Sequence, residues 1–329
     1  MEEKTQQKKV TRKVIHYLIA NHIIRKEKGR DLFSQTGIYP NEKAWLKFLN
    51  QSLMVLGVVF SVCGIIFFFA YNWTEMHKFF KLGLIEAGII GVALFIFFKK
   101  PETFAFKIGL TALVLITGAL FATFGQIYQT GANAYDFFLN WTLVVTIWVI
   151  ISRFPLLWLI YLILINTTVV LYAEQVLRHD EETELFVVLL GINGVVLLVW
   201  EWFSYHQKSF SRARWFPRIV AMAPILILTV LTNSGIDNSF HKWPEVLGGV
   251  MYVLMIPVCY FIYTKIIRDL FILVLLAISL ISVINFLIFE KAPDDLEAFF
   301  LSGFFSIAMT VLLVWQFVRL GKQWKEEVE

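Results

Sequence analysis

The sequence predicts an all-α, polytopic transmembrane helical bundle of about ten spans, with a small cytoplasmic helical segment at the N-terminus. Three observations predict this class. Hydrophobic residues make up 58% of the 329 residues and charged residues only 16%, whereas a soluble domain is roughly a quarter charged. The apolar residues occur in blocks of about 20, the length at which a helix crosses the hydrocarbon core. Lysine and arginine are concentrated in alternate connections between these blocks.

Ten apolar blocks, each bounded by charged residues, proline or polar clusters, are predicted to span the bilayer. They are Leu53–Tyr71, Leu82–Phe98, Ile108–Phe124, Phe137–Ile151, Phe154–Ala173, Leu185–Phe203, Ile219–Thr232, Val246–Thr264, Leu270–Phe289 and Ala298–Val318. The fourth and seventh blocks are short, so the sequence defines their ends least well.

The orientation follows from the basic residues, because cytoplasmic loops are enriched in Lys and Arg. With the N-terminus inside, most of the 29 basic residues fall in cytoplasmic segments. The predicted outside loops hold only Lys78, Lys81, Arg178, Lys242 and Lys291. Merging or dropping one span would disrupt this alternation. The sequence therefore predicts ten spans with both termini in the cytoplasm.

Residues 1–50 are predicted to form a cytoplasmic helical segment, and residues 51–329 the transmembrane domain. Val14, Tyr17 and Leu18 share one helix face, and Trp45 and Phe48 lead into the first span. This segment is expected to rest on the membrane surface, where it can also bind a protein partner. Attraction to anionic lipid explains its basic residues, so no nucleic-acid partner is predicted. The oligomeric state is not predicted.

Two stretches of sequence resemble a known family. The first span ends in FFFAYNW, and GALFATFGQIYQTGANAYDFFLNW bridges the third and fourth spans. With the helical N-terminal segment, these resemble a family of bacterial membrane proteins of unknown function, over roughly residues 10–170. The most specific parts are Asn72-Trp73 and the group Gly125, Gln126 and Tyr128. The resemblance implies the bacterial inner (cytoplasmic) membrane, and it implies no reaction and no catalytic residue.

Polar residues near the outer ends of several spans form the candidate site. Glu86 lies within the second span, where an ionised carboxylate facing hydrocarbon costs several kcal/mol, so such residues usually face the bundle interior. Polar residues of the other spans are expected at the same depth. The sequence thus predicts an outward-facing polar pocket formed by Glu86, Gln126, Tyr128, Asn72, Asn140 and Glu174.

Alternative interpretations are open for these residues. Glu86 is either functional or the partner in a structural hydrogen bond. The other polar residues form either the pocket or the ordinary polar ends of spans, with Trp73 and Trp141 in an aromatic belt. In favour of the pocket, Gly118, Ala122 and Gly125 form a small-residue stripe along which the third span can pack closely.

The remaining polar residues predict no catalytic residue, metal or cofactor. His77, His179 and His241 lie in three different outside loops without metal-ligand spacing. No phosphate-binding loop, dinucleotide turn or hydrolase motif is present in the sequence. Glu201 is expected to snorkel to the inner interface, and Pro224 and Pro257 are expected to kink their helices.

Two functions compete, and an enzyme is the third. The first is a transporter or a solute- or lipid-handling protein, which the intramembrane polarity around Glu86 favours. The second is a membrane-anchored sensor, scaffold or assembly partner acting through the N-terminal helices. A charged pathway across the membrane is missing from the pattern, because Asn166, Asn193 and Asn285 are the main polar residues at mid-span. This sparse polarity favours the second function.

Overall fold

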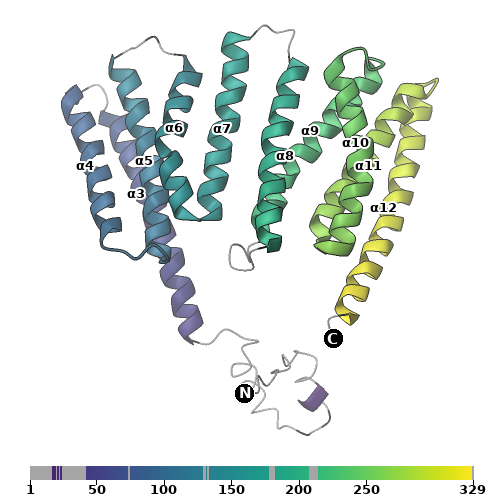
Figure 1. The fold of residues 1–329 in the computed structure, drawn as a ribbon, viewed down its shortest axis with the longest axis horizontal. Coiled ribbons are helices and arrows are strands. Elements are labelled where there is room, and N and C mark those ends of the chain that lie inside the picture. The colour runs from purple at the N-terminus through teal and green to yellow at the C-terminus, as the bar shows by residue number, and fades with distance from the viewer. Residues whose placement is uncertain are drawn as a thin grey trace. The chain divides into compact units, whose positions relative to one another are not determined.

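The computed structural model describes residues 17–19, 21, 23, 42–72, 75–128, 131, 133–177, 182–206 and 214–327. The long elements of this part of the chain are all helices, shown in Figure 1. They are α3 (Glu42–Asn72), α4 (Lys78–Phe97), α5 (Phe104–Tyr128), α6 (Ala134–Ser152), α7 (Pro155–Val176), α8 (Glu182–His206), α9 (Trp215–Asp237), α10 (Trp243–Phe261), the π-helix η2 (Ile262–Ile266), α11 (Leu270–Lys291) and α12 (Asp295–Glu326).

Among the described residues, the ten predicted spans are confirmed as ten helices of sufficient length and hydropathy to cross a membrane. Most of the helices continue past the apolar blocks that predicted them. The seventh block, predicted as Ile219–Thr232, lies within α9, which begins at Trp215 and ends at Asp237. Pro217 is tolerated in its first turn, where a backbone N–H has no partner within the helix. The last block ends at Val318, whereas α12 continues to Glu326.

The chain divides into two compact units, Met1–Leu120 and Phe121–Glu329. In the N-terminal unit, α4 and α5 pack through Ile85 and Ile116, which are almost fully buried. Val62 and Ile65 of α3 cover this pair. The helix α3 is continuous from Glu42, so residues 42–50 extend the first span. The predicted boundary at residue 50 stays a prediction, and most of the predicted N-terminal helices lie outside the described residues.

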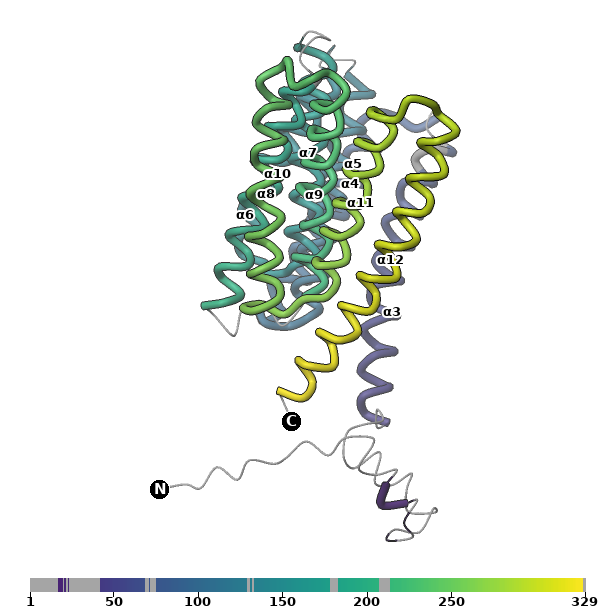
Figure 2. Tube along the Cα trace, turned by 90° about the vertical axis from the view of Figure 1, so that its right-hand side faces the viewer, coloured from purple at the N-terminus to yellow at the C-terminus, as the bar shows by residue number. Residues whose placement is uncertain are grey.

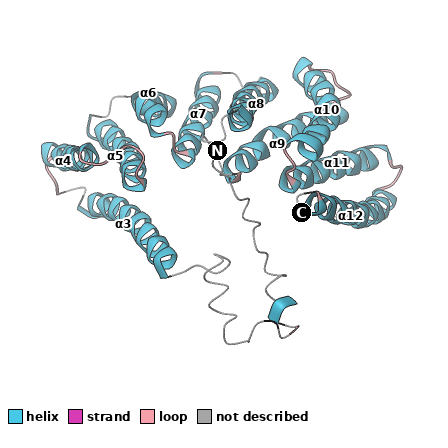
Figure 3. Ribbon diagram, turned by 60° about the horizontal axis from the view of Figure 1, so that its bottom comes forward, coloured by secondary structure: helices cyan, strands magenta, loops and turns pink. Residues whose placement is uncertain are grey.

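In the C-terminal unit, α9 is the central helix. Figure 3, which looks obliquely along the helices, shows α8, α10 and α11 next to it. The buried face of α9 includes Val220, Ala221, Leu228 and Leu231. α10 approaches α9 closely, since a Cβ atom at Gly248 would lie 2.6 Å from the Cβ of Leu231. Figure 2 shows α12 beside α11 and extending past it at the C-terminal end.

Polar side chains also connect helices within this unit. Asn166 of α7 and Asn193 of α8 hydrogen-bond to each other. Ser279 of α11 lies 2.6 Å from the Thr229 hydroxyl of α9 and 2.9 Å from the Tyr252 hydroxyl of α10. Such bonds stabilise helix association in lipid, where a polar group has few other partners. The mid-span polarity of this unit is therefore largely used for helix packing.

Candidate functional site

The predicted outward site divides between the two units. Asn72 is the last residue of α3, and Glu86 lies on α4 with its side chain exposed within the N-terminal unit. The other four residues belong to the C-terminal unit, and their side chains are also exposed there: Gln126, Tyr128, Asn140 and Glu174. The pocket that joins all six residues stays a prediction.

Local contacts account for part of this outer region. Asn140 donates from its side-chain amide to the Asp136 carbonyl oxygen of its own helix at 2.8 Å. The backbone N–H of Tyr135 donates to Gln175 Oε1 of α7 at 3.3 Å, and the Tyr135 ring packs edge-on against Tyr172. The N-terminal end of α6 and the C-terminal end of α7 are therefore in contact, beside the predicted residue Glu174.

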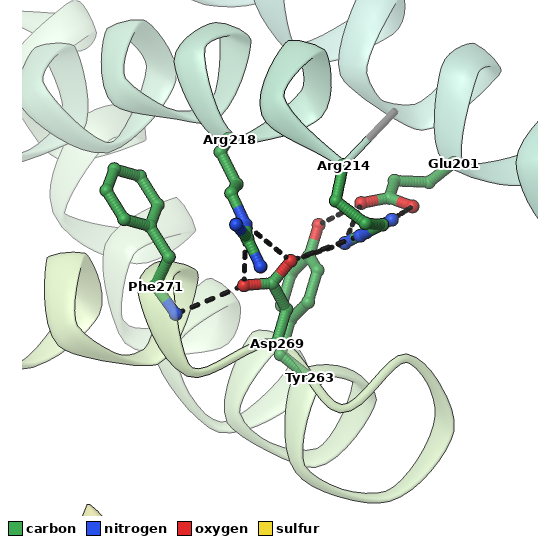
Figure 4. Close-up of polar contacts among 6 residues, drawn as sticks. All are labelled: Glu201, Arg214, Arg218, Tyr263, Asp269 and Phe271. Carbon is green, nitrogen blue, oxygen red and sulfur yellow. Dashed lines mark hydrogen bonds and ion pairs between the residues drawn. The ribbon is translucent and has the colours of Figure 1, made fainter. Parts of the chain in front are cut away.

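At the opposite end of the C-terminal unit, four charged side chains converge (Figure 4). We call Glu201, Arg214, Arg218 and Asp269 the charged cluster. Glu201 lies near the end of α8, Arg214 is the N-cap residue of α9, and Arg218 follows one turn later on the same face. Asp269 is the N-cap residue of α11 and accepts a hydrogen bond from the Phe271 N–H at 3.1 Å. Aspartate is among the best N-cap residues, which explains its place here.

Arg214 bridges the two carboxylates of the charged cluster. Its Nη1 donates to Glu201 Oε2 at 2.8 Å and its Nη2 to Glu201 Oε1 at 3.1 Å, a bidentate pair. Its Nη2 and Nε also donate to Asp269 Oδ2, at 2.9 and 3.1 Å. Arg218 donates from Nε to both oxygens of Asp269, at 3.1 and 3.0 Å. The cluster therefore joins α8, α9 and α11 at one end of the unit.

Hydrogen bonds within the charged cluster favour the charged forms of Asp269 and Arg214. Burial alone would raise the pKa of the Asp269 carboxyl, but hydrogen bonds from Arg218 and Arg214 outweigh burial and lower that pKa. Burial alone would lower the pKa of the Arg214 guanidinium, but its bonds to Glu201 and Asp269 raise that pKa. Asp269 is thus a carboxylate and Arg214 a guanidinium at neutral pH. Because the Asp269 side chain is only 1% exposed, its charge requires this pairing.

The connection from α10 to α11 positions Tyr263 and Asp269 in the site. η2 is a π-helix, a local form that is frequent at functional sites, and it brings Tyr263 into the interior. The Tyr263 hydroxyl donates to Glu201 Oε1 at 3.2 Å. Arg268 then adopts a left-handed backbone with φ of 56°, which is strained for a residue with a Cβ atom. Asp269 follows directly, so the unusual backbone aims its carboxylate at the two arginines.

An apolar groove of about 370 Å³ lies within the unit, and one of its lining residues, Tyr263, hydrogen-bonds to Glu201 of the charged cluster. It lies between α8 and α10, with α9 as its floor, and its inner end is formed by Tyr263 and Ile272. Two bonds connect α8 to α10 and to its continuation η2: Trp243 Nε1 of α10 donates to Glu184 Oε1 at 3.1 Å, and Tyr263 of η2 donates to Glu201. The walls include Gly191, Gly194, Leu198, Ala221, Ile225, Leu228, Met251, Met255 and Cys259.

The groove and the charged cluster share one face of α9. Arg214 and Arg218 precede Ala221 and Ile225 at intervals of three or four residues, which places all four along one side of a helix. Tyr263 belongs to both features, since its ring lines the groove and its hydroxyl bonds to Glu201. The site therefore has an apolar body and a charged end.

The sequence indicated little of this arrangement. Glu201 was expected only to snorkel to the interface, whereas it accepts bonds from Arg214 and Tyr263. Arg214 and Arg218 entered only the count of basic residues next to spans, and no role was predicted for Asp269. The available signal was the spacing of two arginines one turn apart at the start of one span, with an aspartate opening a later span.

Comparisons with known proteins bear on the first half of the chain. Neither the curated proteins nor the solved structures that were compared give a match. The sequence resemblance is confirmed by a family match that ends in α7, before the charged cluster. Residues 16–158 match the family described as "Predicted membrane protein (DUF2157)", a family of membrane proteins of unknown function.

Proposed function

We propose that this chain is a lipid-handling membrane protein. An amphiphilic molecule places its apolar tail in the groove between α8 and α10 and its polar head beside the charged cluster. The single observation that carries the proposal is the continuity of the two features at Tyr263, which lines the groove and hydrogen-bonds to Glu201. A membrane lipid has the same division into one long apolar part and one charged end.

The dimensions of the groove support this proposal. Its volume of about 370 Å³ lies in the range of roughly 300–1,000 Å³ found for ligand pockets. Gly191 and Gly194 form part of the α8 wall, and a Cβ atom added at either would meet nothing within 4 Å. The glycines thus keep the groove wide where larger side chains would fill it.

The test fills the groove without disturbing the fold. Gly194→Leu places a side chain into the groove, and the matched control Gly303→Leu places one on α12, away from it; a Cβ atom has open space at both positions. Both variants should unfold at or slightly above the wild-type temperature, because leucine favours helix by roughly 0.5–1 kcal/mol over glycine. Crosslinking of a phospholipid with a photoreactive acyl chain, in nanodiscs, is then mapped to peptides.

The two variants should differ in crosslinking. We expect Gly194→Leu to lower crosslinking to Met251 and Met255 of α10 at least tenfold, equivalent to about 1.4 kcal/mol, and Gly303→Leu to leave it unchanged. Equal crosslinking in the two variants would contradict a lipid site in the groove.

We also propose that the protein lies in a bacterial inner membrane with both termini in the cytoplasm. The support is the concentration of basic residues at one end of the C-terminal unit, including Arg153, Arg214, Arg268 and Lys325. On this orientation the charged cluster lies at the cytoplasmic interface. A cysteine introduced at Ala132 should react with an impermeant thiol reagent outside intact cells, and one introduced at Ser209 should not. The opposite result would reverse the orientation.

A sensor or scaffold is the second candidate function. The observation that favours it is the N-terminal extension of α3, where Trp45 and Phe48 are exposed and pack edge to face at 5.8 Å. Such a surface suits the membrane interface or a protein partner. Deleting residues 1–36 should leave the membrane domain inserted, because insertion depends on the spans. Failure of the truncated chain to insert would remove this support.

A further inference from the structure

We propose that Arg218 is a phosphate-binding residue that selects the head group at the polar end of the groove. This inference rests on the proposed function, because it names the chemistry of the amphiphile's head. It starts from the unequal use of the two arginines in the charged cluster. Arg214 donates from all three of its guanidinium nitrogens to Glu201 and Asp269. Arg214 is therefore a structural bridge with little capacity for a ligand.

Arg218 is used differently. It donates from Nε to both carboxylate oxygens of Asp269. Within the described part of the chain, its two terminal nitrogens, Nη1 and Nη2, make no hydrogen bond, and the side chain is 40% exposed. A guanidinium group anchored through Nε presents its remaining N–H groups as a planar fork. This fork matches two oxygens of a phosphate group.

The surroundings of Arg218 hold that fork in place. The guanidinium carbon lies 5.9 Å from the centre of the Phe271 ring, a cation–π contact that restricts the plane of the group. Figure 4 shows Arg218 between Asp269 and the Phe271 ring. Ile272, the next residue after Phe271, lines the groove. A phosphate held by Arg218 therefore lies beside the end of the apolar groove, at the first turn of α9.

The exposed surface of the charged cluster is cationic, although its four charges balance. The carboxylate side chains of Glu201 and Asp269 are 11% and 1% exposed, whereas the arginine side chains are 30% and 40% exposed. An approaching anion thus meets guanidinium groups, with the acidic groups covered behind them. The start of α9 adds the positive end of a helix dipole. Both effects favour a phosphate over a neutral head group.

The test compares two lipids with identical acyl chains, phosphatidylglycerol, which carries a phosphate, and diacylglycerol, which carries none, as competitors of the photoreactive lipid in nanodiscs. The variants are Arg218→Gln, Arg218→Lys and the matched control Arg319→Gln. Arg319 also lies over an aromatic ring, at 5.7 Å from that of Trp315, but on α12 and away from the groove. Thermal unfolding is measured for each variant, so that a loss of binding is compared among folded proteins.

We expect the wild-type protein to prefer phosphatidylglycerol about tenfold, as one additional charge-assisted hydrogen bond supplies. Arg218→Gln should reduce this preference to near unity. Arg218→Lys should give an intermediate preference, because the charge is kept and the planar fork is lost. Arg319→Gln should keep the wild-type preference. An unchanged preference in Arg218→Gln, or none in the wild type, would overturn the assignment.

A second arm separates a lipid head group from free phosphate. Inorganic phosphate is titrated into the wild-type protein, Gly194→Leu and Arg218→Gln, and binding is followed by calorimetry. Phosphate binding that is lost in Arg218→Gln but kept in Gly194→Leu would identify free phosphate as the ligand. Selective lipid binding without phosphate binding would identify the lipid. Unchanged lipid crosslinking in Gly194→Leu would contradict the lipid-handling function. The calorimetry of Arg218→Gln tests the role of Arg218 in phosphate binding independently of that result.

Discussion

The Tyr263 hydroxyl donates to Glu201 Oε1 at 3.2 Å and so joins η2, at the end of α10, to the end of α8. Because Tyr263 lines the groove, this bond links the groove to the charged cluster. Tyr263→Phe removes the bond and keeps the ring that lines the groove. We expect a loss of about 0.5–1.5 kcal/mol in unfolding free energy, with lipid crosslinking retained. Thermal unfolding and crosslinking on the same sample check this, and loss of crosslinking would show that the hydroxyl itself binds the lipid.

Asp269 is expected to be the most sensitive position of the charged cluster. Asp269→Ala removes an N-cap and leaves two arginines without their shared carboxylate, so we expect a loss of about 2–4 kcal/mol in stability. Asp269→Asn keeps an oxygen for the cap and should cost about 1 kcal/mol less. The control is Glu327→Gln, which breaks the exposed ion pair with Arg268 and should change stability by less than about 0.5 kcal/mol. Equal effects of Asp269→Ala and Glu327→Gln would contradict a structural role for the cluster.

The contribution of Asp269 and Arg214 to the unfolding free energy should not depend on pH near neutrality. The pKa of Asp269 is lowered by folding, so its contribution is present above the unfolded pKa of about 3.9 and is lost as the pH falls through the lower folded value. The pKa of Arg214 is raised, so its contribution to the unfolding free energy is fully present at neutral pH and is lost only in strongly alkaline solution, above its unfolded pKa. The stability difference between the wild type and Asp269→Asn should thus be constant from about pH 5 to 9. A steep change in that range would indicate another titrating group.

The paired amides of Asn166 and Asn193 should behave as one unit. Asn193 donates to Asn166 Oδ1 at 2.8 Å and to the Leu189 carbonyl at 2.8 Å, and Asn166 donates to Asn193 Oδ1 at 3.1 Å. Asn193→Leu leaves Asn166 without this partner and should cost about 1–2 kcal/mol. The double variant with Asn166→Leu should cost less than the sum of the single changes. Additive losses would show that the two amides do not interact in the membrane.

Glu86 tests the predicted outward pocket. If its carboxyl is hydrogen-bonded in a pocket, Glu86→Gln should be nearly neutral and Glu86→Leu should destabilise by about 1–3 kcal/mol. If its side chain faces lipid, as its exposure within the N-terminal unit allows, Glu86→Leu should stabilise the protein. Unfolding temperatures of the two variants in the same detergent decide between these outcomes.

The number and order of the helices were predictable because each apolar block is long enough to cross a membrane alone. The helix ends were less predictable, because charged residues such as Arg319 and Lys325 leave the apolar pattern but continue α12. Pro224 falls inside α9 without ending it, and the kink expected there stays a prediction. Hydropathy therefore reports where a chain meets lipid more accurately than where a helix stops.

The charged cluster was not predictable in the same way. Arg214 and Asp269 are 55 residues apart, and their pairing requires α9 and α11 to be neighbours, which the apolar pattern does not specify. The groove depends on the path of α10 between its bonds to Glu184 and Glu201. A lone charge within a span, such as Glu86, indicates a candidate site because its burial in lipid is costly. Charged residues at span ends are common, so the sequence alone does not show which of them pair.

The most direct test of the lipid-handling proposal is an experimental structure determined in lipid nanodiscs. The proposal predicts an elongated, tail-shaped density between α8 and α10, passing Gly194 and Met255, with its head beside Tyr263 and Arg218. The same experiment on Gly194→Leu should show the groove filled by the new side chain and no such density. A wild-type structure in which α8 and α10 pack directly against each other along Gly194, leaving no space for a tail, would contradict the account.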